Sequence, residues 1–133
     1  MKYYLDTNIC IYFLKGKFPL LIEKLLSNNP DNIKIPSIVK AELLYGAEKS
    51  QKQLENLEKI YQFIFPLETV AFGDKESIEY SYIRSLLEKE GKIIGPNDLI
   101  IAATVKANDG VLVTNNIKEF IRVDGLKVEN WLE

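Results

Sequence analysis

Residues 2–9 read Lys-Tyr-Tyr-Leu-Asp-Thr-Asn-Ile and set the class of fold. Tyr3 to Asp6 predicts a short buried strand that ends on a carboxylate, and a helical segment from Ile9 to Leu14 follows directly. Gly16 is expected to stop that helix. A strand that passes straight into a helix is the repeating unit of α/β proteins.

The rest of the chain repeats this alternation. Further short strands are predicted at 33–35, 67–70, 111–114 and 127–129, with helical segments between them and the last strand at an edge. The run Val-Leu-Val-Thr at 111–114 is apolar throughout, which favours a central strand of a parallel sheet. The pattern predicts one domain over residues 1–133, an α/β sandwich around a mostly parallel sheet.

One long helix is predicted over residues 74–90, closed by Gly91. Its apolar residues recur at helical spacing and predict a buried stripe. The members of that stripe are Ile78, Tyr82, Ile83, Leu86 and Leu87.

Composition narrows the class of protein. The chain has 133 residues, of which 47% are hydrophobic and 27% charged, and this suffices for a folded core without disulfides. Cys10 is the only cysteine, so no disulfide forms within the chain, and the cytoplasm is the expected compartment. No signal peptide is expected, and no apolar stretch approaches the roughly 18 residues that a membrane span needs.

Three acidic residues, Asp6, Glu42 and Asp98, lie inside or beside apolar runs, and the chain contains no histidine. In a parallel sheet, ligands gather at the carboxyl ends of the strands, where these three side chains are expected to meet. Convergent carboxylates repel one another unless a cation neutralises them. A site with oxygen ligands only indicates a hard divalent cation rather than zinc or iron.

Each of these residues also has a purely structural interpretation. Asp6 could bond to the next backbone amides in a turn, and Glu42 could occupy a solvated helix position. Asp98 could interact favourably with a helix dipole. Asn116 and Glu119, three residues apart, fit a helix-capping pair. The joint occurrence of the acids, rather than any one of them, favours a functional site.

Several polar and basic residues accompany the acids. Thr7, Asn8 and Thr114 are polar neighbours; the two threonines either orient carboxylates and metal-bound water or are ordinary strand-end residues. The net charge of −2 argues against a nucleic-acid binder unless bound cations offset the acids. Basic side chains that could contact phosphates, or simply be solvated, are Lys15, Lys17, Lys49, Lys52 and Arg84.

Four motifs together resemble the PIN domain, and more narrowly the VapC-type toxins of bacterial toxin–antitoxin pairs. They are Leu-Asp-Thr-Asn-Ile at 5–9, Ala-Glu-Leu-Leu-Tyr-Gly at 41–46, Gly-Pro-Asn-Asp-Leu-Ile-Ile-Ala-Ala at 95–103 and Leu-Val-Thr-Asn-Asn-Ile-Lys-Glu-Phe at 112–120. The resemblance covers essentially the whole chain. It implies a three-layer α/β/α sandwich with a central, mostly parallel sheet.

The resemblance also implies an activity. It implies an endoribonuclease that depends on Mg²⁺, with Mn²⁺ able to substitute, that acts on RNA, with tRNA the expected substrate. It further implies a homodimer and a VapB-like antitoxin whose C-terminal segment covers the site. Asp6, Glu42 and Asp98 match the three core acids of the family, with Asp6 and Asp98 as the chief metal ligands. Asn116 stands where many PIN domains have a fourth acid, and Glu119 is a candidate to replace that acid, directly or through water. Thr104 stands where close relatives often have histidine.

Two other functions remain open at the level of sequence. A haloacid-dehalogenase-like phosphatase would use Asp6 as a nucleophile, but that chemistry wants a second aspartate two residues on, where this chain has Asn8. A non-catalytic PIN-like module would use the acids to bind RNA or a partner.

Overall fold

The computed structural model describes all residues from 1 to 133 and contains one five-stranded sheet. Its strands are β1 (Tyr3–Leu5), β2 (Ile33–Pro36), β3 (Glu68–Val70), β4 (Val111–Val113) and β5 (Lys127–Glu129). The strand order is β3-β2-β1-β4-β5, and every neighbouring pair is parallel.

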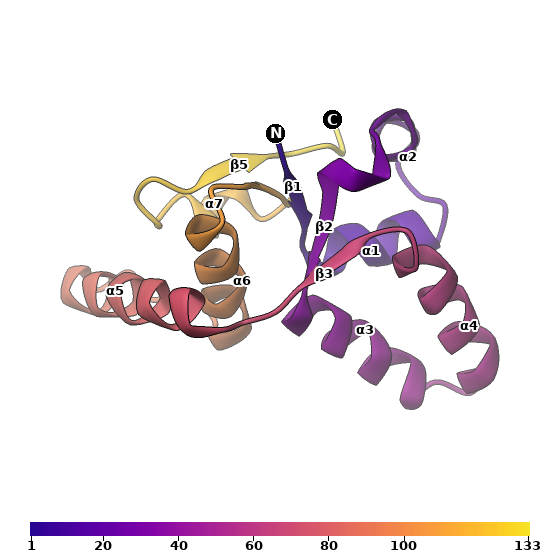
Figure 1. The fold of residues 1–133 in the computed structure, drawn as a ribbon, viewed down its shortest axis with the longest axis horizontal. Helices are drawn as coiled ribbons and strands as arrows, with labels where there is room; N and C mark the ends of the chain where they lie inside the picture. The colour runs from indigo at the N-terminus through magenta and orange to yellow at the C-terminus, as the bar shows by residue number, and fades with distance from the viewer.

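Seven α-helices connect and cover these strands. They are α1 (Thr7–Leu14), α2 (Pro19–Ser27), α3 (Ser37–Glu48), α4 (Gln53–Ile64), α5 (Asp74–Glu90), α6 (Pro96–Ala107) and α7 (Ile117–Phe120), with a 3-10 turn at Pro30–Asn32. In Figure 1, α5 and α6 lie on one side of β1 and β2, and α1 and α4 lie on the other. The predicted three-layer α/β/α sandwich is confirmed. None of the helices combines the length and the apolar character required to span a membrane.

The order of the strands creates a crevice at one edge of the sheet. The chain moves outward from β1 through β2 to β3, and then returns to the other side of β1 with β4 and β5. The direction of winding therefore reverses between β1 and β4, the place where α/β sheets characteristically bind ligands. The expected central strand, β4, is an interior strand, but β1 takes the middle position.

The expected stripe on α5 is only partly buried. Ile83 and Leu87 are buried, whereas Ile78 is 71% exposed and Tyr82 is 62% exposed, so the prediction is wrong for these two residues. Helix α5 packs chiefly on α6, at the outside of the molecule (Figure 1). A helix whose main contacts are with one other helix buries only a narrow face, which leaves Ile78 and Tyr82 in solvent.

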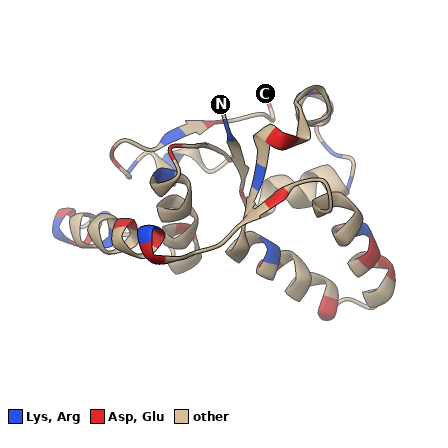
Figure 2. Cartoon of the chain, viewed as in Figure 1, with Lys and Arg blue, Asp and Glu red and all other residues tan.

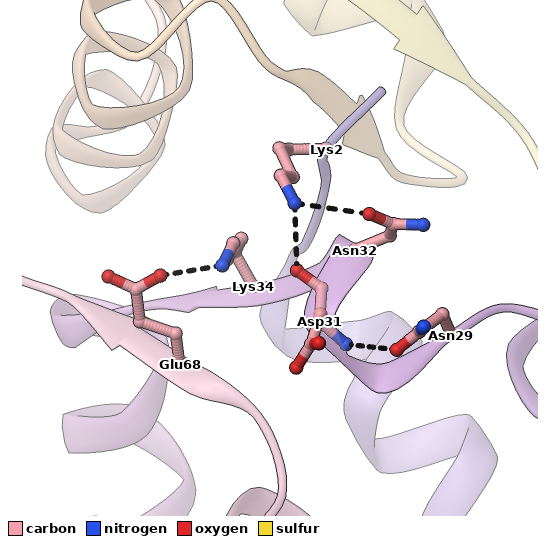
Figure 3. A network of polar contacts seen from close by, with 6 residues as sticks. All are labelled: Lys2, Asn29, Asp31, Asn32, Lys34 and Glu68. Atoms are coloured by element: carbon pink, nitrogen blue, oxygen red, sulfur yellow. Dashed lines mark hydrogen bonds and ion pairs between the residues drawn. The ribbon is translucent and has the colours of Figure 1, made fainter.

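Polar contacts tie β1, β2 and β3 together near their amino ends (Figure 3). Lys34 Nζ lies 2.6 Å from Glu68 Oε1, and these two residues face each other across β2 and β3. This hydrogen bond and the positive charge of Lys34 lower the pKa of the Glu68 carboxyl. Lys2 Nζ donates to the Asp31 carbonyl oxygen at 3.2 Å and to Asn32 Oδ1 at 3.1 Å. These contacts leave the carboxyl edge of the sheet free.

Candidate active site

Asp6 lies at the crevice between β1 and β4. It directly follows β1 and is the N-cap of α1, with Oδ1 accepting a hydrogen bond from the Ile9 backbone N–H at 3.0 Å. Its own N–H donates to the Val113 carbonyl at 3.2 Å, and Oδ2 accepts from the Thr114 hydroxyl. The structural interpretation of Asp6, in which its side chain bonds to a following backbone amide, is therefore correct. The same carboxylate also lines the polar cavity described below. Asp6 is only 6% exposed, and burial raises the pKa of its carboxyl despite these hydrogen bonds.

Glu42 reaches the same crevice from α3. Its Oε1 accepts a hydrogen bond from the Thr7 hydroxyl at 3.0 Å, which links the first turn of α1 to the middle of α3. Glu42 is half-buried rather than fully solvated. Its negative charge contributes to the raised pKa of Asp6.

Asp98 comes from the first turn of α6, which begins at Pro96. A negative charge in the first turn interacts favourably with the helix dipole, which agrees with the structural interpretation of Asp98. However, the pKa of the Asp98 carboxyl is raised to about 6. Burial is the largest cause, followed by the negative charges of Glu119, Asp6 and Glu42. Asp98 is thus held in a field of negative charge that the protein itself does not neutralise.

These side chains line one small polar cavity of about 150 Å³ at the carboxyl edge of the sheet. The structure therefore brings together Asp6, Glu42 and Asp98, as predicted, along with Thr7, Asn8 and Asn116. The full lining is Asp6, Thr7, Asn8, Glu42, Asp98, Ile101, Asn116 and Phe120.

The donor set of the cavity suits a divalent cation. Every polar group in it offers oxygen, from a carboxylate, a hydroxyl or an amide, and these are the ligands that Mg²⁺ and Mn²⁺ favour. A cation would also relieve the repulsion that raises the pKa of Asp98. The acids do not form a ready-made group of three ligands around one point, so binding would require their side chains to draw together.

Thr114, Asn116 and Glu119 form a chain of hydrogen bonds beside Asp6. The Asn116 backbone N–H donates to Thr114 Oγ1 at 2.9 Å, and the Thr114 hydroxyl donates in turn to Asp6. The Asn116 side-chain amide donates to Glu119 Oε2. Asn116 occupies the N-cap position of α7, but its side chain makes no hydrogen bond to the helix backbone. Asn116 and Glu119 therefore bond to each other through their side chains and do not cap the helix as a capping pair would. Glu119 does not line the cavity, yet it acts on Asp98 through its charge.

Two apolar residues of the site were not predicted from the sequence. Ile101 and Phe120 line the cavity alongside the acids. Ile101 follows Asp98 by three residues and Phe120 follows Asn116 by four, so helical spacing places each beside a polar lining residue. Their apolar contact lowers the local polarity, which strengthens electrostatic interactions within the cavity.

A larger cavity of about 510 Å³ lies between α1, α3 and α4 and shares Glu42 with the polar one. Its walls are mainly apolar, with Ile11, Leu14, Leu43, Ala47 and Ile60 among them, and two of its polar residues are Lys15 and Lys59. No local sequence pattern predicts this groove, because its walls come from three separate helices. The shared Glu42 makes the two cavities neighbours.

Two groups near the site are unsuited to catalysis. The Cys10 thiol is fully buried, and burial raises its pKa well above the usual value, so it remains a protonated thiol. Thr104 stands at the position where close relatives often have histidine. Its side chain is buried and donates a hydrogen bond to the Ile100 carbonyl at 2.8 Å. The oxygen groups that line the cavity are therefore the candidates for catalysis and metal binding.

Comparison with known proteins agrees with this geometry. The family model described as PIN domain matches residues 3–126. The chain belongs to the PIN-domain family. The PIN domain is 46% identical to Ribonuclease VapC2 of Rickettsia felis, with 98% of each chain covered. It is 37% identical to the tRNA(fMet)-specific endonuclease VapC of Shigella flexneri, again with 98% of each covered.

A solved structure shares the fold of this PIN domain closely. The crystal structure of VapBC2 from Rickettsia felis, bound to a DNA fragment from their promoter, contains a chain that matches with a TM-score of 0.90 and 43% identity. The match covers 98% of this chain and 99% of that one. The resemblance seen in the four sequence motifs is confirmed, and this PIN domain belongs with the VapC proteins.

Proposed function

We propose that this PIN domain is an endoribonuclease that hydrolyses RNA phosphodiester bonds with a bound divalent cation, Mg²⁺ in the first place and Mn²⁺ as a substitute. The observation that carries the proposal is the meeting of Asp6, Glu42 and Asp98 at one polar cavity at the carboxyl edge of the sheet. The names of the VapC relatives, a ribonuclease and a tRNA endonuclease, support it. The whole chain, residues 1–133, would act as a single PIN-like domain.

The site residues would have two kinds of role, binding the cation and orienting the carboxylates that bind it. Asp6 and Asp98 would hold the cation, with Glu42 either beside them or acting through water. Thr114 keeps Asp6 oriented, and Thr7 does the same for Glu42. When bound, the cation supplies Lewis-acid polarisation of a phosphoryl oxygen and lowers the pKa of an attacking water. No side chain of the protein needs to act as a nucleophile.

Asn116 and Asn8 complete the rim of the cavity with neutral amide groups. Asn116 offers no charge where many PIN domains have an acid, and its amide is bonded to Glu119. Asn8 likewise offers no acidic proton to a leaving group, which disfavours the phosphatase alternative. Glu119 would contribute at a distance through its charge on Asp98.

The partners follow from the same family. We propose tRNA as the substrate class, in line with the name of the Shigella flexneri relative. We also propose a homodimer in the cytoplasm, inhibited by a VapB-like antitoxin. The apolar groove between α1, α3 and α4 supports the last point, since a segment seated there would reach the carboxylates past Glu42.

The test is cleavage of a tRNA pool by the purified chain with Mg²⁺, with Mn²⁺ and with EDTA. Asp6→Asn and Asp98→Asn should each reduce cleavage by at least about 100-fold, because a lost ligand weakens the site that activates water. The variant Glu88→Gln, on the exposed side of α5, is the matched control. Full activity in both aspartate variants, or in EDTA, would contradict the proposal.

Two cellular measurements extend this test. Expression of the unaltered chain without an antitoxin should arrest growth, and Asp98→Asn should relieve the arrest. Sequencing of RNA 5′ ends after brief induction would identify the cleaved bond. An intact Mg²⁺ site, measured by calorimetry, combined with no cleavage of any RNA would favour the non-catalytic alternative.

A further inference from the structure

Tyr45 is an exposed aromatic residue on α3, close to the acidic cavity. Its side chain is 65% exposed, and the Lys49 ammonium lies 4.9 Å from the centre of its ring. Neither residue belongs to the hydrophobic core. An isolated exposed aromatic is common on protein surfaces, so the position and the partner of Tyr45 must carry the inference.

The position is set by the helix. Glu42, Tyr45 and Lys49 follow one another at spacings of three and four residues, which places them on one face of α3. Glu42 lines the acidic cavity. Helix α3 leaves the carboxyl end of β2 and runs outward from the sheet (Figure 1). Tyr45 and Lys49 therefore lie about 4.5 Å and about 10 Å beyond Glu42 along the helix axis.

The partner distinguishes this pair from a similar one elsewhere. Tyr82 on α5 is 62% exposed, and Lys106 lies 5.7 Å from the centre of its ring. However, Lys106 also forms an ion pair with Glu79 at 3.3 Å. No carboxylate pairs with Lys49. The Lys49 ammonium is therefore available to an anion from outside the chain.

This availability matters because the molecule has no broad basic surface. Its net charge is −2, and Lys and Arg are interspersed with Asp and Glu along the helices (Figure 2). The acidic cavity would itself repel a phosphate backbone. An RNA strand thus needs local contacts that do not depend on an overall positive field. Stacking on an aromatic ring and a single unpaired ammonium are such contacts.

We propose that Tyr45 and Lys49 form a binding surface for single-stranded RNA that leads into the acidic cavity. One base stacks on the Tyr45 ring, and the Lys49 ammonium contacts an adjacent phosphate. The proposal rests on the proposed ribonuclease function and adds two residues that would position the substrate, an unpaired strand or loop whose bases are free to stack. Neither residue takes part in bond cleavage, so both are substrate-positioning residues.

Binding tests the proposal without cleavage. A labelled single-stranded RNA oligonucleotide is titrated into the Asp98→Asn variant, alone and with a second substitution. Adding Tyr45→Ala should raise Kd by about 5- to 150-fold, the range expected for one stacked base. Adding Lys49→Ala should reduce the salt dependence of log Kd by about 0.7, the contribution of one phosphate contact on a single strand. Tyr82→Ala and Lys106→Ala are the matched controls and should leave Kd unchanged.

Aromatic replacements separate stacking from ordinary apolar contact. Tyr45→Phe should bind RNA as the unaltered residue does, whereas Tyr45→Leu should bind as weakly as Tyr45→Ala. Tyr45→Trp adds an exposed indole to a chain whose only tryptophan, Trp131, is 3% exposed. Its fluorescence should fall when RNA binds, and the fluorescence of a Tyr82→Trp control should not.

Kinetics provide the readout that a structural role would not produce. In the otherwise unaltered enzyme, Tyr45→Ala should raise KM with little change in kcat, because the lost contact is made equally before and during the reaction. Unchanged Kd and KM in Tyr45→Ala would overturn the proposal, as would equal RNA binding by Tyr45→Leu and Tyr45→Phe. A change of oligomeric state in Tyr45→Ala, measured by sedimentation, would also overturn it and assign Tyr45 to a contact between copies.

Failure of the proposed function has a different signature. Absence of cleavage by the unaltered chain, with RNA binding that still depends on Tyr45, would overturn the ribonuclease function and leave this RNA-binding surface supported. Cleavage that depends on Asp98 but not on Tyr45 would support the ribonuclease function and overturn the RNA-binding surface.

Discussion

The Thr114 hydroxyl donates a hydrogen bond to Oδ2 of Asp6 and so joins the carboxyl ends of β1 and β4 at the crevice of the sheet. The bond lowers the pKa of the Asp6 carboxyl, in opposition to the larger effect of burial. Because Thr114 also accepts from the Asn116 backbone, its position is fixed by both neighbours. The orientation of Asp6 therefore depends on a residue 108 positions away.

Replacement of Thr114 by valine should impair the site without changing its shape. The loss of the hydroxyl removes a bond that lowers the pKa of Asp6, so that pKa should rise further. As pH falls, activity that requires ionised Asp6 should then be lost at a higher pH than in the unaltered protein, so the acid limb of the pH–rate profile should shift to higher pH. At neutral pH we expect a loss of about 10- to 100-fold, as for other groups that orient metal ligands. Thr114→Ser, which keeps the hydroxyl, is the control; an acid limb identical in both variants would contradict the prediction.

The metal-free protein should become less stable as pH rises through the titration of Asp98. The folded state raises the pKa of this carboxyl from 3.8 to about 6, so the folded protein binds its proton more tightly than the unfolded chain. The resulting stabilisation is fully present below about pH 4 and is lost as pH rises through about 6. In EDTA, Tm should fall across this window, and Asp98→Asn should flatten the fall. Equal pH slopes for the two proteins would show that Asp98 is not the group responsible.

Substitution of Asn116 by aspartate would test the open side of the cavity. A fourth carboxylate would add repulsion in the metal-free state and attraction for a cation. We expect Asn116→Asp to bind Mn²⁺ more tightly in calorimetry and to have a lower Tm at pH 7 in EDTA. Asn116→Ala removes the amide without adding charge and serves as the control. A variant that binds the ion no better than Asn116→Ala would argue that position 116 does not face the ion.

Gly110 and Gly46 should respond in opposite ways to alanine. A Cβ on Gly110 would lie 2.3 Å from Tyr4 Cε1 and 2.5 Å from Tyr4 Cδ1, so the ring and the start of β4 would have to move apart. We expect Gly110→Ala to lose about 1–3 kcal/mol of unfolding free energy, the usual cost of overpacking. Gly46 lies within α3 with nothing within 4 Å of the added Cβ, so Gly46→Ala should gain about 0.5–1 kcal/mol. Urea unfolding of both variants measures the difference.

The sequence predicted the meeting of the acids because it depends on topology alone. Asp6 follows strand β1, and Asp98 lies in the first turn of α6, the helix that precedes strand β4. Parallel strands such as β1 and β4 have their carboxyl ends at the same edge of the sheet. Other features depend on packing that periodicity does not encode. Ile78 and Tyr82 have the correct spacing for a buried stripe, yet α5 packs chiefly on α6 and leaves both side chains exposed.

Side-chain partners were the least predictable part of the site. Asn116 and Glu119 have the spacing of a capping pair, but the Asn116 side-chain amide bonds to the Glu119 carboxylate instead of the helix backbone. The pairing of Thr7 with Glu42 joins residues 35 positions apart and requires the packing of α1 on α3. Such contacts follow from the tertiary structure and have no local signal.

Because Cys10 is buried, its reaction with a thiol reagent can report opening of the fold. Its thiol is the only one in the molecule, and its backbone N–H is bonded to the Asp6 carbonyl, one helical turn behind the carboxylate. A thiol reagent can reach it only when α1 separates from the sheet, so the labelling rate measures how often that opening occurs. Ion binding at Asp6 should slow the labelling, so the labelling rate would report occupancy of the site independently of RNA cleavage.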